Sequence, residues 1–327
     1  MKPQSIARRS LLLAALLASS TSLMAQTAGN YPSQPIKIIV PYPAGGATDT
    51  LARMVGAKLS EAWKQPVIIE NRPGASGNIG NDAVAKAPGD GYTVLMGITA
   101  LIQAPALYRK LPYDPIRDLV AVSEVARTPS LFAVPAASPA KTMRDFIILA
   151  KSNPNRYNYG SYGNGTSSHI QGSLLNLQAG LDLTHIPYKG AAPLVNDLIG
   201  GQLASAFVDA ATARPHLTTG KFRVLAVTGA QRMKSLPDVP TFTELGYHSY
   251  GLYGWFGLFM PAATPKPVVN KFSNEVGKIL RTPEVSAKIA DLGLTVVGNK
   301  PEEFARSVKS DAEVYAKIIK QAGITID

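Results

Sequence analysis

The chain has 327 residues, which is long enough for two domains that each bury a core of their own. Hydrophobic residues make up 46% and charged residues 17%, which fits a globular protein and excludes a disordered one. The formal net charge is +11, but lysines and arginines are scattered and form no basic run, so we expect no binding to nucleic acid. The chain has no cysteine, which excludes disulfides and a lipid anchor on cysteine.

The N-terminus has the layout of a secretory signal peptide, which we assign to residues 1–25. Basic residues precede a short apolar run from Leu11 to Leu17, and small residues lead to Ala25. The run is too short to span a bilayer comfortably. We therefore expect export to the periplasm of a Gram-negative cell, with the general secretory and twin-arginine routes both open because Arg8 and Arg9 precede the run.

Residues 36–49 are expected to form a buried strand, a glycine loop and the start of a helix. The segment 36–40 is apolar apart from Lys37, two prolines and two glycines follow, and Thr48 and Asp49 are candidate helix N-caps. A helix start carries unpaired N–H groups and roughly half a positive charge. Glycines let a ligand approach that backbone, so the loop suits a small anion, although an ordinary βα turn is the alternative. Asp49 either caps the helix or faces the ligand as an acceptor.

The remainder of the first hundred residues alternates strands and helices, which is typical of a doubly wound, mostly parallel sheet. Strands are expected at 65–69 and 92–97, and a helix at 78–87. The polar loop 70–77 leads into this helix. Its glycines lack the spacing of a dinucleotide-binding loop.

A second α/β unit of the same kind follows. It contains a second glycine loop at 161–169, which lies between a strand and a helix. Its other expected strands lie at 130–134, 183–187, 203–208 and 222–228, with a short helix at 242–245. The C-terminal strands at 253–260 and 295–298 most simply return to the first unit. The predicted domains are therefore 30–126 plus 248–327, and 127–247.

Both glycine loops follow the carboxyl ends of strands, where open α/β sheets bind ligands. If the two units face each other, two positive helix starts converge on one cleft. One helix start contributes about 0.3–1 kcal/mol, whereas a micromolar ligand needs about 8 kcal/mol, so direct amide and hydroxyl bonds are also expected. Candidate ligand-binding residues are Gly45, Gly46, Thr48, Asp49, Ser161, Gly163, Gly165, Thr166, Ser168, Tyr188, Lys189, Gly190 and Asp209.

Some of these candidates have equally plausible structural roles. Lys189 is either a solvated surface lysine or a ligand contact, and Asp209 either caps a helix at 210–214 or lines the cleft. Valine at Gly46 or Gly165 is expected to abolish binding and to leave the fold intact, because a side chain there would block approach to the backbone.

Catalytic and metal-binding patterns are missing from the sequence. The four histidines are far apart and have no metal-ligand spacing. There is no Gly-x-Ser-x-Gly elbow and no P-loop. We therefore expect no catalytic residue, no metal and no cofactor.

Several motifs together resemble one family, the Bug-type solute receptors of tripartite tricarboxylate transporters. They follow one another in the family's order over essentially the whole mature chain: residues 39–46 with Asp49, 70–75 with 77–80, 90–93, 188–190, 236–241 and 301–304. Tyr42, Ala44 and Ala75 lie in these motifs and complete the set of candidate ligand contacts. Three positions depart from the family's usual residues: Tyr42 replaces phenylalanine, Thr166 replaces serine, and Gln103-Ala104-Pro105 replaces Ile-Asn-Pro.

The resemblance implies an α/β fold of the two-lobed periplasmic-binding-protein type (type II). It implies a small carboxylate held in the cleft by both loops, often through water, and delivered to a large and a small permease subunit in the membrane. We also expect a monomeric receptor that is not an enzyme. A secreted hydrolase and a ligand sensor for a receptor kinase are the alternatives on the same scaffold.

Overall fold

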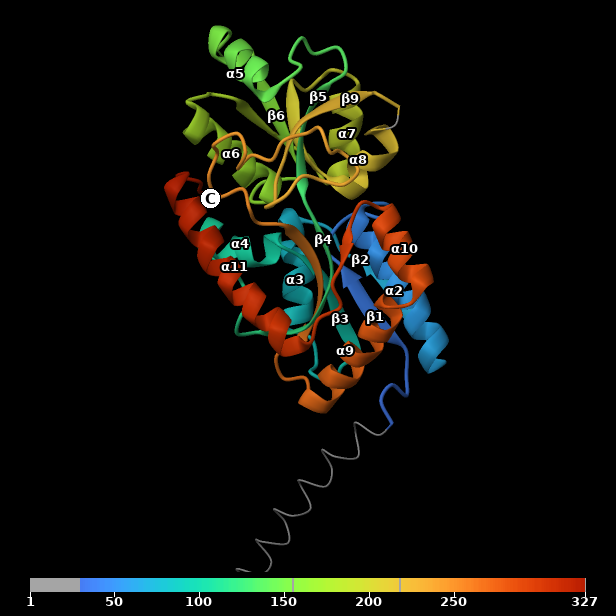
Figure 1. The fold of residues 1–327 in the computed structure, drawn as a ribbon. Helices are drawn as coiled ribbons and strands as arrows, with labels where there is room; N and C mark the ends of the chain where they lie inside the picture. Colours follow the sequence, from blue (N-terminus) through green and yellow to red (C-terminus); the bar gives the residue numbers. More distant parts are fainter. Residues whose placement is uncertain (1–29, 155, 218, 327) are drawn as a thin grey trace, which may run out of the picture.

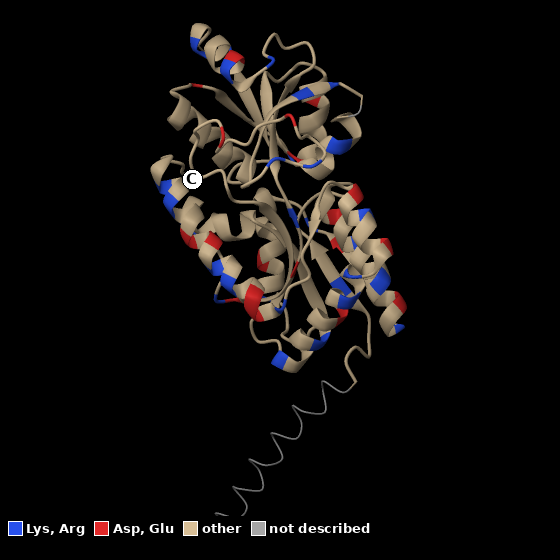
Figure 2. Cartoon of the chain, viewed as in Figure 1, with Lys and Arg blue, Asp and Glu red and all other residues tan. Residues whose placement is uncertain are grey.

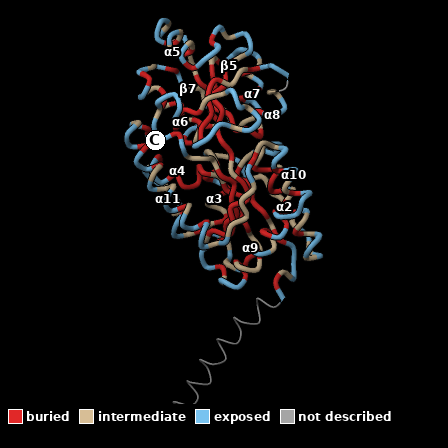
Figure 3. The backbone as a smooth tube through the Cα atoms, in the orientation of Figure 1, coloured by how far each residue is buried: buried red, intermediate tan, exposed pale blue. Residues whose placement is uncertain are grey.

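The computed structural model describes residues 30–154, 156–217 and 219–326, so the predicted signal peptide lies outside the described residues. Two mixed β-sheets, each flanked by helices, form two lobes stacked end to end (Figure 1). Buried residues are concentrated along the strands in the middle of each lobe (Figure 3). In the described part of the chain, no helix combines the length and the apolar character needed to cross a membrane.

The sheet of the first lobe has six strands in the order β11-β4-β10-β3-β1-β2. Its strands are β1 (Ile36–Val40), β2 (Val67–Asn71), β3 (Thr93–Ile98), β4 (Leu119–Thr128), β10 (Gly254–Pro261) and β11 (Thr295–Val296). β1, β2 and β3 are parallel, whereas β10 runs antiparallel to both β3 and β4. Six α-helices and the short 3-10 helix η1 (Ala75–Gly77) flank this sheet: α2 (Ala47–Trp63), α3 (Asn78–Ala85), α4 (Ala100–Leu107), α9 (Lys266–Leu280), α10 (Pro283–Asp291) and α11 (Pro301–Gln321).

Alternating side chains along the strands of the first lobe pack in two different cores. Ile38 and Val40 pack in the core that includes residues of α2, α9 and α10. Ile39 packs on the other face with residues of α3, α4 and α11. This is the period of two that a strand imposes when both faces of its sheet are covered. The covered sheet explains why 36–40 is almost continuously apolar.

The sheet of the second lobe has five strands in the order β7-β6-β8-β5-β9. They are β5 (Ser130–Pro135), β6 (Asn158–Ser161), β7 (Thr184–Pro187), β8 (Ser205–Asp209) and β9 (Phe222–Val227). β6 is parallel to β7 and β8, and β5 is antiparallel to β8 and β9. Its helices are α5 (Met143–Ser152), α6 (Ser167–Ala179), α7 (Ala191–Ile199) and α8 (Ala210–Leu217).

The two-lobed α/β architecture agrees with the expectation from sequence, but the sheets are mixed rather than mostly parallel. The chain leaves the first lobe along β4 and continues at once into β5, and it returns along β10. Because outgoing and returning strands lie side by side, β4 and β10 pair antiparallel. Both are largely buried, so the sequence pattern could not distinguish their direction from that of parallel strands.

Two local predictions differ from the structure. Residues 242–246 form a single turn instead of a short helix, because Gly246 with φ of 85° ends it at once. Helix α4 was not predicted. It contains Pro105, has no side-chain cap at its start and carries apolar residues on all sides, so it lacks the usual helix pattern.

Candidate functional site

A cavity of about 120 Å³ lies between the two lobes. Both glycine loops and the strands that connect the lobes contribute to its wall. The first lobe supplies Tyr42, Pro43, Ala44, Gly46, Ala47, Thr48, Ile98, Thr99, Thr128, Gly254, Trp255 and Phe256. The second lobe supplies Ser130, Tyr162, Thr166, Ser167, Lys189, Gly190, Ala191, Ala192, Pro193 and Asp209.

Four helices begin at this cavity, so its wall contains several helix N-termini, the positive ends of the helix dipoles. The first residues of α2, α6 and α7 line it, and so does Asp209, which directly precedes α8. The N-cap residues Gly46, Thr166 and Gly190 make no side-chain capping bond. The first N–H groups of these helices therefore stay available to a ligand, and the helix dipoles favour one that is negatively charged.

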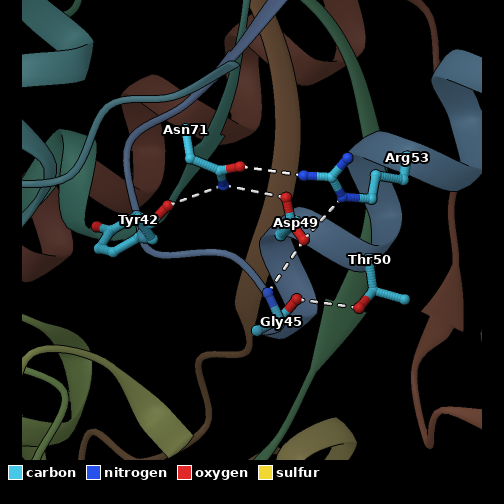
Figure 4. A network of polar contacts seen from close by, with 7 residues as sticks. Tyr42, Gly45, Asp49, Thr50, Arg53 and Asn71 are labelled. Carbon is cyan, nitrogen blue, oxygen red and sulfur yellow. Dashed lines mark hydrogen bonds and ion pairs between the residues drawn. The ribbon is translucent and has the colours of Figure 1, made fainter. Parts of the chain in front are cut away.

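The first glycine loop is held by the Asp49 carboxylate (Figure 4). Asp49 accepts hydrogen bonds from Gly45 N (3.0 Å) and Arg53 Nε (3.0 Å) through Oδ2, and from Asn71 Nδ2 (3.0 Å) through Oδ1. Asn71 also donates to Tyr42 O at 3.0 Å. Burial by itself would raise the pKa of Asp49, but the bonds from Arg53, Gly45 and Asn71 outweigh it and lower the pKa. Asp49 is therefore an anion that shapes the loop.

The prediction that Thr48 or Asp49 is the N-cap of this helix is wrong. The N-cap is Gly46, whose carbonyl accepts from Thr50 N at 3.0 Å. Thr48 lies in the first turn and lines the cavity, whereas Asp49 is only 4% exposed and points into the loop network. Asp49 therefore neither caps the helix nor lines the cavity: its carboxylate binds Gly45 N, one residue before the N-cap, and so orders the loop.

The second glycine loop is held from behind by its own hydroxyl groups. Ser161 Oγ donates to Gly163 O and accepts from Gly163 N, each at 3.2 Å. Thr166 Oγ1 donates to Gly163 O at 2.8 Å, and Ser168 Oγ accepts from Tyr162 N at 3.0 Å. Ser161 and Ser168 do not line the cavity. These hydroxyls therefore order the loop, and Thr166 is the one of these three that also reaches the cavity wall.

Two stacked imidazoles lie behind the second loop. The rings of His169 and His185 are 4.0 Å apart between centroids and 9° from parallel. His169 Nδ1 accepts from Gly165 N at 3.1 Å, and His185 Nε2 lies 2.6 Å from Ser161 Oγ. Burial lowers the pKa of His169 to about 4, and burial together with the neighbouring His169 lowers that of His185 to about 3. Both rings are therefore neutral at pH 7 and act as hydrogen-bond partners of the loop.

The remaining predicted residues divide between the cavity and the loop scaffold. Lys189 is exposed and lines the cavity, while the Tyr188 hydroxyl donates to Asp197 Oδ2 at 2.6 Å and lies outside the lining. Asp209 fills both roles considered for it: it accepts from Thr212 N at 2.9 Å at the start of α8, and it lines the cavity. Burial, with the charge of Asp209 next in importance, raises the pKa of the adjacent Tyr162.

Half of the candidate residues line the cavity and half do not. Those in the lining are Tyr42, Ala44, Gly46, Thr48, Thr166, Lys189, Gly190 and Asp209. Those outside it are Gly45, Asp49, Ala75, Ser161, Gly163, Gly165, Ser168 and Tyr188. The sequence predicted an apolar strand at 253–260, but it did not predict that Trp255 and Phe256 line the cavity.

The expectation for Gly165 also needs correction. A Cβ at Gly165 would lie 2.8 Å from Ile326 Cδ1 and 2.8 Å from Leu107 Cδ1, and the residue has a φ of 75°. Valine there would thus disturb the packing of the loop against α4 and the C-terminal segment. A Cβ at Gly46 meets no atom within 4 Å, so valine at Gly46 is still expected to abolish binding and to leave the fold intact.

Comparisons with known proteins show the family to which the chain belongs. Residues 51–324 match the family model described as tripartite tricarboxylate transporter family receptor. BugT of Bordetella pertussis is 31% identical over 299 residues, covering 91% of this chain and 92% of BugT.

Two solved structures of related proteins have the same fold. The R. palustris protein Rpa4515, solved with adipate, is 33% identical with a TM-score of 0.87, over 91% of this chain and 100% of that one. MatC of Rhodopseudomonas palustris, with bound malate, is 30% identical with a TM-score of 0.84, over 88% of this chain and 100% of that one. The chain belongs to the Bug-type receptors of tripartite tricarboxylate transporters, which bind a solute and are not enzymes.

Proposed function

We propose that this protein captures a small organic carboxylate between its lobes and delivers it to the membrane subunits of a tripartite tricarboxylate-type transporter. The observation that carries the proposal is the convergence of the uncapped starts of α2, α6 and α7 on one interlobe cavity. Such starts favour an anion that accepts backbone hydrogen bonds. The adipate and malate bound to two relatives support a carboxylate as that anion.

Ligand capture involves closure of the lobes, with domains at 30–126 plus 248–327 and at 127–247. The chain crosses between the lobes at Pro129, between β4 and β5, and at the start of β10 at Gly254, which lies near these boundaries. A ligand that contacts both lobes only when they are close together favours the closed state, because binding shifts the equilibrium toward the state with more contacts. Gly46 and Thr48 on one side, and Thr166 and Lys189 on the other, are the proposed contacts.

The receptor works in the periplasm as a monomer, after removal of residues 1–25. Membership of a periplasmic receptor family supports this location, and the signal-like N-terminus supports the export step. In the described part of the chain, lysines and arginines are spread over both lobes among acidic residues (Figure 2). This mixed distribution does not favour nucleic acid as a partner. A large and a small permease subunit are the proposed partners.

A thermal-shift screen tests the proposal. A panel of aliphatic and aromatic carboxylates is compared with the matching uncharged amides, which keep the shape and remove the charge. A ligand at 100 times its Kd stabilises the folded state by about 2.7 kcal/mol, which is expected to raise the melting temperature by several degrees. The proposal fails if no acid raises the melting temperature, or if amides raise it as much as their acids do.

A further inference from the structure

Beside the cavity, the two lobes meet along a seam formed by α4 and α11 of the first lobe and α6 of the second (Figure 1). Leu107 on α4, Ile170 on α6 and Ile319 on α11 are buried in one apolar core that continues from lobe to lobe. The loop before α6 packs on the same seam, because a Cβ at Gly165 would lie 2.8 Å from Leu107 Cδ1. Polar side chains in this seam are therefore surrounded by apolar groups and depend on one another for hydrogen bonds.

Three polar side chains meet within the seam, and we call them the seam cluster: Gln103, Ser167 and Tyr315. Gln103 Nε2 donates to Ser167 Oγ at 2.9 Å. Gln103 is 0% and Tyr315 is 4% exposed. Burial raises the pKa of the Tyr315 hydroxyl, and hydrogen bonds with Ser167 and Gln103 lower it in part. The Tyr315 hydroxyl therefore lies within reach of both other members of the cluster.

The bond between Gln103 and Ser167 crosses the boundary between the lobes. Gln103 belongs to α4, whereas Ser167 is the first residue of α6 and lines the cavity. A hydrogen bond of normal length is lost when its two atoms move apart by about another ångström. Separation of the lobes at the seam therefore breaks this bond, and closure forms it.

We propose that the seam cluster is a latch that favours the closed arrangement of the lobes and positions the start of α6 before a ligand arrives. The inference rests on lobe closure, which is part of the proposed function, and goes beyond it by naming groups of the protein itself that favour closure. In the open arrangement, water can bond to the amide and the hydroxyls. In the closed arrangement they must bond to one another, because a buried polar group that loses its partner is costly.

Pulsed electron paramagnetic resonance on the ligand-free protein tests the latch. The chain has no cysteine, so spin labels can be attached at Ala62→Cys on α2 and Asn196→Cys on α7 alone. Both positions are exposed and belong to different lobes, so the distance between the labels reports the open and closed populations.

The test compares two further variants with this labelled parent. Ser167→Ala leaves a buried N–H of Gln103 without its partner when the lobes are closed. It is expected to raise the ratio of open to closed protein at least about fivefold. Adding Gln103→Met replaces both partners by apolar groups and is expected to return the ratio to within about twofold of the parent, since such paired replacement is nearly neutral.

Ser173→Ala is the matched control, because it is the same substitution on the same helix. The Ser173 hydroxyl lies 3.1 Å from Tyr159 Oη, inside the second lobe, so this variant should keep the distances of the parent. The latch is overturned if the parent has no closed population, if Ser167→Ala has the same distances as the parent, or if the double variant stays as open as Ser167→Ala. None of these results involves a ligand, so the proposed carboxylate binding stands or fails separately in the thermal-shift screen.

Discussion

Replacing Gly46 by valine is expected to weaken ligand binding at least 100-fold, about 2.7 kcal/mol, without lowering the melting temperature of the free protein. Gly46 has φ of −83° and ψ of 172°, an extended conformation that valine adopts readily. A Cβ there meets no protein atom within 4 Å, but the residue lines the cavity at the start of α2. The added side chain would therefore cover the N–H groups that receive the carboxylate. Calorimetry with the acid found by screening measures the loss.

Two other glycines serve as controls for this prediction. Gly251 is exposed, and a Cβ there also meets no atom within 4 Å, so Gly251→Val is expected to keep both affinity and stability. Gly165→Val is expected to lower the melting temperature, because its Cβ would clash with Ile326 and Leu107. Unchanged affinity in Gly46→Val would show that the start of α2 does not hold the ligand.

Acid is expected to destabilise the protein through the stacked pair His169 and His185. An unfolded histidine has a pKa near 6.5, whereas burial lowers the folded pKa values to about 4 and about 3. Below about pH 6.5 the unfolded chain therefore binds more protons than the folded one, and stability falls as the pH falls toward these values. At pH 5 the loss is roughly 2 kcal/mol for each imidazole, hence about 4 kcal/mol for the pair.

Urea unfolding at pH 7.5 and at pH 5 measures this loss. The double variant His169→Gln with His185→Gln removes both titrating groups, so its stability should fall about 4 kcal/mol less between the two pH values than that of the parent. His248→Gln, at an exposed position, is the matched control and should behave like the parent. An equal pH dependence in the parent and the double variant would contradict the assignment of acid sensitivity to this pair.

The sequence predicted the parts of the site that depend on local patterns. A strand, a glycine loop and a helix start can be recognised within a segment of about fifteen residues, and both loops were located in this way. The strand and helix alternation also predicted two α/β units. These features follow from backbone preferences, which a short segment expresses by itself.

The sequence could not predict features that depend on distant segments meeting in space. Trp255 lines the cavity because β10 pairs between β3 and β4. The sequence near residue 255 does not indicate that these two strands are its neighbours. Ser161 and Ser168 were expected to contact the ligand, but their hydroxyls instead hold the loop, which only the three-dimensional arrangement determines. His169 and His185 stack across sixteen residues of chain, a spacing that matches no motif.

Gln103 shows how a departure from the family pattern can be interpreted with the structure. It stands where isoleucine is usual in the family, and its side chain is fully buried and does not line the cavity. Its Nε2 donates to Ser167 Oγ at 2.9 Å, at the start of α6. Gln103 therefore links α4 of the first lobe to a ligand-facing helix of the second.

A crystal structure of the protein with its tightest-binding acid tests the central claim most directly. The measured quantities are the distances from the ligand carboxylate oxygens to the backbone nitrogens of the first turns of α2, α6 and α7. We expect hydrogen bonds, direct or through one water, to helix starts from both lobes. A carboxylate that contacts one lobe alone, or that binds outside the cavity between residues 43–48 and 161–167, would contradict the account.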